Sequence, residues 1–499
     1  HSVYSFKHAL VQEAAYATML RGDRVPIHRR VIEVFETLFP EEATRHPDAL
    51  AHHCAAAEMW EKAIEFRIRA NRTALERSAG IEAQAHVEMA IALLPKIAAA
   101  ATARQWEGRL QVALGDALTM TRGFAAPEVM TALLRARELL DETAHPIELL
   151  RALCGLFNYH LMRSESPLCL GLVEPFVAHE TDRSTATVVH YLMGTAHLHL
   201  GQFDRSIAHL ETALARYDET LCRPVAFVAG YHVRSFTLIW LGLAYVYTGS
   251  LTQAGDTITA AVHDARGRSH PFTLVSALLA LARFRSQVHD FAGAERATEE
   301  GLAIATEQRS PYHLSRGNIL RAGNLIDAGR AEEGIALMQR ALDAHRATGA
   351  NFQSSYNLSR LALAYAALGR HDAAIRLADD ALSEVNRSGE RWWEAEAERC
   401  KGEVLLAASQ THQVGAEACF QRALECARAQ RAKLWELLAA QSMARLWGDQ
   451  GRVDEASRLL APLCEAFNDD ATFPVLIRAT ETLRSLGKRV QPVPSERSA

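Results

Sequence analysis

The side chains best suited to chemistry in this sequence are grouped histidines, with one cysteine beside them. His52, His53 and Cys54 are consecutive, and His197 and His199 are two residues apart. Neighbouring residues on a helix point about 100° apart, so neither group converges on one ion without ligands from elsewhere. We therefore predict no metal site in this chain.

Recognisable catalytic motifs do not occur in the sequence. Asp379 and Asp380 are neighbours on an expected exposed helix, so they cannot face each other as an acid and a base. No GxxxxGK[ST] phosphate-binding loop, GxSxG or HExxH occurs anywhere in the chain. The sequence predicts that this chain is not an enzyme and binds no cofactor of its own.

The elements that position these side chains follow a repeated spacing of small residues. In the segment 361–382, "LALAYAALGRHDAAIRLADDAL", Ala362 and Ala374 mark the close crossing of two helices. Gly369 ends the first helix, where a positive φ costs glycine little. The pattern resembles a tetratricopeptide repeat, which usually has a period of about 34 residues. It predicts an all-α right-handed superhelix of helical hairpins.

The same marks recur along most of the chain. From Gly242 to Gly402 the small residue of the first helix returns every 40 residues. The residues at the small first-helix position are Ala51, Asn71 (in a degenerate unit), Gly115, Gly155, Gly194, Gly242, Ala282, Ala322, Ala362, Gly402 and Ala444. The expected turn glycines are Gly201, Gly249, Gly329, Gly369 and Gly451. The interval from Gly194 to Gly242 is eight residues longer than the others, which predicts an insertion around "DETLCRPVAFV".

The first helix of each tetratricopeptide hairpin lines the concave face of the array. Its second, fifth, ninth and twelfth positions here combine apolar side chains with several arginines. The predicted partner groove contains Tyr191, Phe236, Arg283, Arg316, Ile319, Tyr356, Arg399 and Glu403. Such a surface suits an amphipathic helix or an extended peptide. The alternative is that packing within the whole protein closes part of this face.

Two adjacent tryptophans, Trp392 and Trp393, stand at the start of an expected helix. They could form a stacking platform for a ligand, but the repeat register favours a place in the core.

Composition limits the kinds of partner. The net charge is −5 and no long apolar run occurs, which argues against nucleic acid and membrane partners. The eight cysteines are scattered without a CxxC pair, as expected for a reduced cytoplasmic protein.

Three strings carry a closer resemblance: "FKHALVQEAAY", followed by "IHRRVIEVFE", and later "HPDALAHHCAAAEMWEKAIEF". They resemble bacterial signal-transduction ATPases of the AAA/STAND type, in which a class III adenylate or guanylate cyclase often precedes the ATPase. A winged-helix segment and tetratricopeptide-like repeats then follow. The resemblance implies a protein-interaction or sensor arm, with ATP and Mg²⁺ bound only in upstream domains. It also implies that His8 contacts the bound nucleotide in the whole protein.

This comparison divides the chain into five expected segments. They are the end of a winged-helix or linker segment (1–43), degenerate helical repeats (44–180), a regular array (181–470), a capping helix (471–488) and a disordered tail (489–499). Because the chain opens within a pattern and without methionine, we expect it to be a piece of a longer polypeptide. The alternative function is the inducer-binding repeat domain of an ATPase-type transcription regulator, although the C-terminal end has no basic recognition helix.

Overall fold

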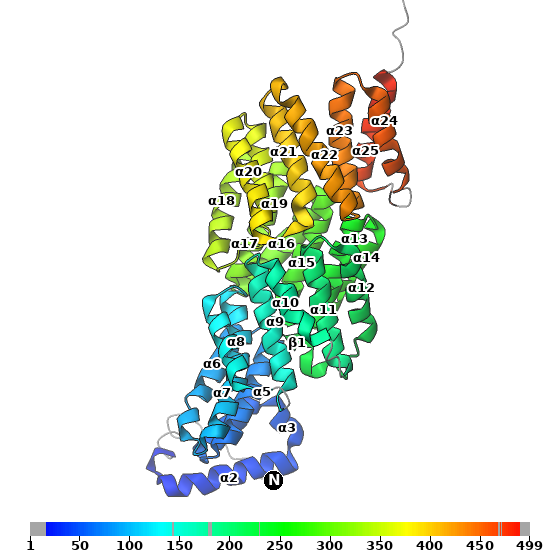
Figure 1. Cartoon of the computed structure of the whole chain (residues 1–499). Coiled ribbons are helices and arrows are strands. Elements are labelled where there is room, and N and C mark those ends of the chain that lie inside the picture. The colour runs from blue at the N-terminus through cyan, green and yellow to red at the C-terminus, as the bar shows by residue number, and fades with distance from the viewer. Residues whose placement is uncertain are drawn as a thin grey trace, which may run out of the picture. The chain divides into compact units, whose positions relative to one another are not determined.

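The computed structural model is almost entirely helical (Figure 1). It describes residues 16–141, 144–177, 182–228, 230–467, 470 and 472–489. His8, the first part of the expected winged-helix segment and nearly all of the expected tail lie outside these residues. Two compact units are present: unit 1, His1–Leu118 with Thr131–Ala152, and unit 2, Thr119–Met130 with Leu153–Ala499.

Unit 1 is a set of short helices packed through small residues. Its elements are α2 (Arg21–Leu38), α3 (Pro40–Arg45), α4 (Pro47–Ala56), α5 (Trp60–Glu76), α6 (Gly80–Ile91), η1 (Leu94–Lys96) and most of α7 (Ala100–Arg122), α8 (Pro127–Leu139) and the start of α9 (Pro146–Met162). Ala51 of α4 and Ala63 of α5 are fully buried, together with Ile32, Leu50 and Phe66. The absence of bulk at Ala51 and Ala63 allows α4 and α5 to pack closely.

Unit 2 contains the regular hairpins. They pair α11 (Arg183–His199) with α12 (Phe203–Arg216), α13 (Val233–Thr248) with α14 (Leu251–Gly267), α15 (Pro271–Gln287) with α16 (Phe291–Glu307), α17 (Pro311–Asp327) with α18 (Ala331–Ala347), α19 (Ser354–Ala367) with α20 (His371–Ser388), α21 (Glu394–Ala408) with α22 (Gln413–Ala429), and α23 (Lys433–Asp449) with α24 (Val453–Glu465). The helix α10 (Ser166–Val177) precedes them, α25 (Pro474–Arg489) follows them, and the turns η3 (Arg391–Trp393) and η4 (Gln410–His412) flank α21. First helices of successive hairpins also contact one another, from α11 through α25.

The structure confirms the predicted all-α solenoid and its turn chemistry. The five expected turn glycines all have positive φ: Gly201 (71°), Gly249 (89°), Gly329 (79°), Gly369 (70°) and Gly451 (81°). At the helix crossings, side chains leave no room for more atoms. A Cβ placed on Gly242 would lie 2.4 Å from Ile258 Cγ1 of the paired helix. Among the described residues, no helix combines the length and the apolar character needed to cross a membrane.

The insertion expected between Gly194 and Gly242 forms a small β-hairpin that the sequence did not predict. After η2 (Arg223–Val225), strands β1 (Phe227–Val228) and β2 (Tyr231–His232) pair antiparallel, with Phe227 opposite His232 and Val228 opposite Tyr231. Tyr231 is fully buried, and its ring stacks on Phe236 at 3.9 Å between centroids. The insertion therefore contributes an aromatic side chain to the interior of unit 2.

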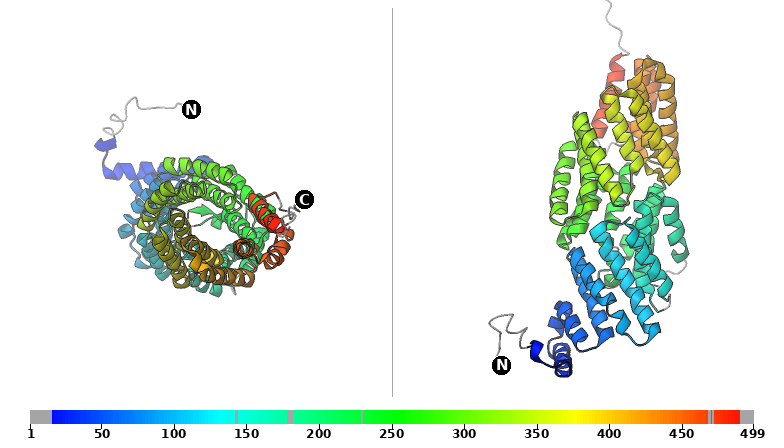
Figure 2. Two further views of the ribbon diagram at one scale, coloured as in Figure 1. Left: turned by 90° about the horizontal axis from the view of Figure 1, so that it is seen from above. Right: turned by 90° about the vertical axis from the view of Figure 1, so that its left-hand side faces the viewer.

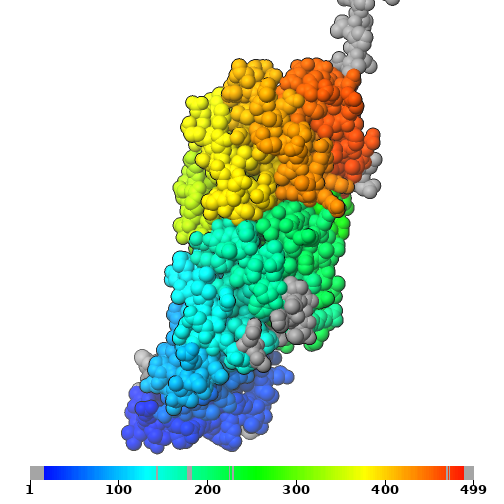
Figure 3. Space-filling view, in the orientation of Figure 1, coloured from blue at the N-terminus to red at the C-terminus, as the bar shows by residue number. Residues whose placement is uncertain are grey.

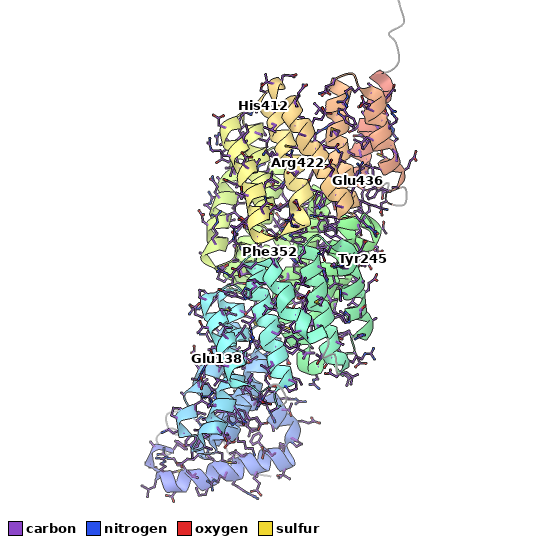
Figure 4. All side chains as sticks on the ribbon, viewed as in Figure 1. Glu138, Tyr245, Phe352, His412, Arg422 and Glu436 are labelled. Atoms are coloured by element: carbon purple, nitrogen blue, oxygen red, sulfur yellow. The ribbon has the colours of Figure 1, made fainter. Side chains whose placement is uncertain are left out.

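Helices of unit 2 wind around so that distant parts of the chain pack together. In the view from above, the green, yellow and orange helices form a ring (Figure 2), and the yellow and orange surfaces lie directly on the green surface (Figure 3). Segments about 190 residues apart are in contact: Asn351 N donates to Met162 O at 2.8 Å, and the His199 ring lies 4.4 Å from the Trp392 ring. Phe352, labelled in Figure 4, lies at this junction and is 2% exposed.

The two adjacent tryptophans belong to this junction, as the repeat register predicted. Trp392 and Trp393 are fully buried, and both rings lie within 6 Å of Tyr247. The Trp435 Nε1 group donates to Trp392 O at 3.0 Å. They therefore pack in the core between stacked turns of the solenoid.

Candidate functional site

A polar pocket of about 220 Å³ lies among the first helices of the hairpins of unit 2. It lies where first helices of successive hairpins converge on α25. Its lining residues are Ser286, Gln287, His289, Phe291, Asp327, Tyr356, Arg360, Glu396, Arg399, Trp435, Leu438, Gln441, Ser442, Arg445 and Arg478. We call this site the polar pocket.

Ion pairs within and between helices hold most of its charged side chains in place. Arg360 of α19 pairs with Asp327 of α17. Arg399 binds Glu396 through two hydrogen bonds of 2.7 Å, from Nε and Nη2. Although burial opposes its charge, the Glu396 carboxylate raises the pKa of Arg399 well above its usual value. The guanidinium groups are thus fixed and permanently charged.

A further carboxylate, Glu403 of α21, ties α21 to α23 at the edge of the pocket. Its Oε1 accepts a hydrogen bond of 2.6 Å from Ser442 Oγ and pairs with Arg445. The same oxygen lies 3.4 Å from Arg399 Nη1. Three of the four arginines at the pocket therefore have carboxylate partners.

The fourth arginine, Arg478 of α25, differs from the others. It is exposed, its guanidinium lies 5.6 Å from the centre of the Phe291 ring, and it forms no ion pair with any carboxylate in the described part of the chain. One positive charge of the pocket thus remains uncompensated. The pocket consequently favours a ligand group with a single negative charge.

Aromatic and neutral polar groups form the remaining wall. Tyr356 packs on Trp393 with 4.3 Å between ring centroids. His289 stacks near Phe291 at 5.6 Å, and burial lowers its pKa to about 4. His289 is therefore neutral near pH 7 and adds no charge of its own.

Three of the predicted groove residues belong to the polar pocket: Tyr356 and Arg399 line it, and Glu403 lies at its edge. Two others are part of the core. Tyr191 is fully buried, and its hydroxyl donates to Tyr231 Oη at 2.9 Å, while Ile319 is 6% exposed within an apolar cluster.

The three remaining predicted residues, Phe236, Arg283 and Arg316, line a different space. It is a small cavity of about 20 Å³ among α9, α13, α15 and α17, which we call the buried cavity. The eight predicted residues are therefore divided among the polar pocket, the buried cavity and the core, and they do not form one continuous groove.

Sequence reasoning missed Asp327, Arg360, Arg445 and Arg478 of the polar pocket. Asp327 and Arg360 lie on inner helices, but at positions that the repeat template assigns to other faces. Arg445 follows Ala444 as Glu403 follows Gly402, so it occupies a concave-face position of the template, in a repeat for which no groove residue was predicted. Arg478 lies on α25, outside the repeat register. A search for arginines clustered on the inner helices and on the helix that follows them is the signal that would have found these residues.

The grouped histidines contact different partners and do not converge on one point. His53 Nδ1 lies 2.7 Å from His28 Nδ1, and His199 Nδ1 lies 2.7 Å from Thr195 O within its own helix. Within the described ranges, no three histidine, cysteine or carboxylate side chains are placed so that they could hold a metal ion.

No family model matches the sequence. A curated relative is an uncharacterized protein of Rhizobium meliloti (strain 1021), which is 25% identical over 464 residues. The alignment covers 89% of this chain and 43% of the relative, so the chain spans less than half the length of the relative it matches.

Several solved structures resemble the chain. A Rap protein complexed with competence and sporulation factor has 12% identity and a TM-score of 0.48, covering 77% of this chain and 98% of its own. A signal-transduction ATPase with a tetratricopeptide repeat sensor from Pyrococcus horikoshii has 13% identity and a TM-score of 0.34, covering 93% of this chain and 75% of its own. Both TM-scores are below 0.5, so the fold is assigned from the helices of this chain alone.

Proposed function

We propose that this chain is a non-catalytic sensor arm that binds a protein or peptide through the polar pocket. The observation that carries the proposal is the uncompensated charge of Arg478 beside the fixed arginines of α19, α21 and α23. An acidic side chain or a terminal carboxylate is the group that would complete this charge arrangement.

The size of the pocket favours one group of a longer ligand over a whole small molecule. About 220 Å³ is less than the usual volume of a site that encloses a drug-sized compound. The ring of Tyr356 offers an apolar surface beside the charges, and polar groups such as Ser442 and Gln441 face the same space. A peptide would place its acidic group here and extend across the neighbouring helices.

In the whole protein, we propose that this binding regulates an upstream ATPase in the cytoplasm, and through it a fused class III nucleotide cyclase. The strings "FKHALVQEAAY" and "IHRRVIEVFE" support this assignment by resemblance. ATP and Mg²⁺ would bind the upstream domains, and His8 would contact the nucleotide. Regulation requires that the ligand bind one state of the ATPase better than the other.

The binding step is tested with the full chain and a library of displayed peptides, prepared with free and with amidated C-termini. We expect peptides with an acidic group to be enriched on the wild type and to bind R478A at least tenfold more weakly. R484A is the matched control because Arg484 is exposed on the same helix and does not line the pocket. Equal binding to wild type and R478A would contradict the proposal.

The regulatory step needs a separate measurement. ATP hydrolysis and cyclic nucleotide formation by the full-length protein are compared with those of a form lacking 181–470. Unchanged rates and an unchanged response to a bound peptide would contradict the proposed regulatory role. They would not contradict the proposed binding of a peptide.

A further inference from the structure

The buried cavity contains two arginines without an acidic partner. Arg283 of α15 is 4% exposed, and Arg316 of α17 is half-buried. Among the described residues, neither forms an ion pair with a carboxylate. Arg283 Nη2 donates to Gln353 Oε1 at 2.5 Å, and Arg316 Nη1 donates to Tyr312 Oη at 2.8 Å. Both cations are thus bound only by neutral groups.

Like charges in this cavity oppose each other. Burial, and to a smaller extent the charge of Arg316, lowers the pKa of Arg283. The rings of Tyr356 and Trp393 lie 5.3 Å from the Arg283 guanidinium and offset part of this cost. Ring faces carry no net charge, so they do not replace a carboxylate paired with the guanidinium groups of the cavity.

The charge of Glu390 opposes the lowering of the Arg283 pKa, but Glu390 accepts its hydrogen bonds from other residues. Glu390 accepts hydrogen bonds from Trp392 Nε1 at 2.9 Å, Ser164 Oγ at 3.1 Å and Gln353 N at 3.2 Å. Its hydrogen bonds reach Arg283 only through the Gln353 residue. Among the described residues, Glu390 therefore forms no ion pair with Arg283 or Arg316, although its charge reaches Arg283.

Two buried donors of the lining lack any partner. Arg283 Nη1 and Gln353 Nε2 have no hydrogen-bond acceptor among the described residues, and Gln353 is 3% exposed. The hydrogen bond from Arg283 to Gln353 Oε1 directs the amide nitrogen away from that guanidinium. Buried donors without acceptors are costly, so the site favours an occupant that only accepts hydrogen bonds.

We propose that the buried cavity binds one small monovalent anion of the size of chloride between Arg283 and Arg316. A cavity of about 20 Å³ has room for one water-sized particle, which favours a monatomic anion over an organic carboxylate or a phosphate. A water molecule has the right size, but it leaves the two positive charges without a counter-charge. The anion joins α15 to α17. This inference does not depend on ligand binding at the polar pocket.

The test uses the full chain with chloride and bromide as probes. In ³⁵Cl nuclear magnetic resonance, the wild type should broaden the chloride line, and bromide should reverse the broadening. The excess linewidth should fall at least fivefold in R283M and in R316M. R346M is the control, because Arg346 is an exposed residue of α18 that pairs with Asp343. Its excess linewidth should equal that of the wild type.

Thermal unfolding at constant ionic strength gives a second readout. Replacing sodium gluconate by sodium bromide should raise the Tm of the wild type and R346M by about 2–4 °C. Q353E places a carboxylate beside Arg283 with little change in shape, so it should fold and lose this halide dependence. Q353E therefore tests anion binding in the cavity even if R283M does not fold.

Crystals of the wild type grown in bromide should show an anomalous peak between the two guanidinium groups. A cavity filled by water only would give no anomalous peak, no halide-specific line broadening and equal Tm values in the two salts. Any of these results for the wild type, or full broadening retained in both R283M and R316M, would overturn the proposal.

Discussion

Ser164 Oγ lies 3.1 Å from Glu390 Oε2, although 226 residues separate the two in the sequence. The same hydroxyl lies 3.0 Å from Asn351 O. A single serine thus joins the loops after α9, α18 and α20, where one turn of the solenoid packs on the next. Because Glu390 is buried at this junction, its ionisation is coupled to the stacking of the turns.

The first prediction concerns the pH dependence of stability. Burial raises the pKa of Glu390 from 4.5 to about 7. In this range the folded state binds more protons than the unfolded state, so the free energy of unfolding should fall as the pH rises from about 4.5 to 7. The contribution is roughly 3 kcal/mol. E390Q should remove this loss, measured by urea unfolding at pH 5 and pH 8.

The control for this measurement is E332Q, since Glu332 is exposed on α18. It should keep the pH dependence of the wild type, including contributions from all other groups. Identical slopes for E390Q and the wild type would show that Glu390 is ionised throughout the range.

The second prediction concerns glycines at helix crossings. A Cβ on Gly402 of α21 would lie 2.4 Å from Phe420 Cε1 of α22. G402A should therefore lower the free energy of unfolding by about 1–3 kcal/mol, in spite of the better helix propensity of alanine. On the same hairpin, a Cβ on Gly415 meets only Leu405 Cδ1 at 3.5 Å. G415A should raise stability by about 0.5–1 kcal/mol. Chemical unfolding of both variants checks the opposite signs.

Local spacing was sufficient to predict the hairpins but not the shape of the binding surface. Gly369 and Ala374 could be placed because a helix crossing constrains residues close together in the sequence. The burial of Tyr191 depends on Tyr231, which the unpredicted β-hairpin brings into the interior. Likewise, contact between His199 and Trp392 requires the rotation accumulated over several hairpins. The spacing of small residues within one repeat carries no information on this accumulated rotation.

The third prediction tests whether a distant side chain caps a helix. Asp470 accepts hydrogen bonds from Leu251 N at 3.1 Å and Thr252 N at 2.9 Å, at the start of α14. Its carboxylate thus satisfies backbone donors that the helix itself cannot. D470A should cost about 1–2 kcal/mol of unfolding free energy and speed hydrogen exchange at the start of α14. D454A, in the first turn of α24, should leave exchange at α14 unchanged, and unaltered exchange in D470A would rule out the cap.

The fourth prediction separates structural from binding arginines in the polar pocket. R399M should lower the free energy of unfolding by about 3–5 kcal/mol, because it leaves the buried carboxylate of Glu396 without its partner. R478A should change stability by less than about 0.5 kcal/mol, since Arg478 is exposed and has no ion pair among the described residues. Only R478A should then weaken binding of an acidic peptide while the fold stays intact. Urea unfolding and peptide titration of both variants measure the two effects. A large loss of stability in R478A would mean that its charge serves the fold, and the excess charge of the pocket would no longer support a ligand.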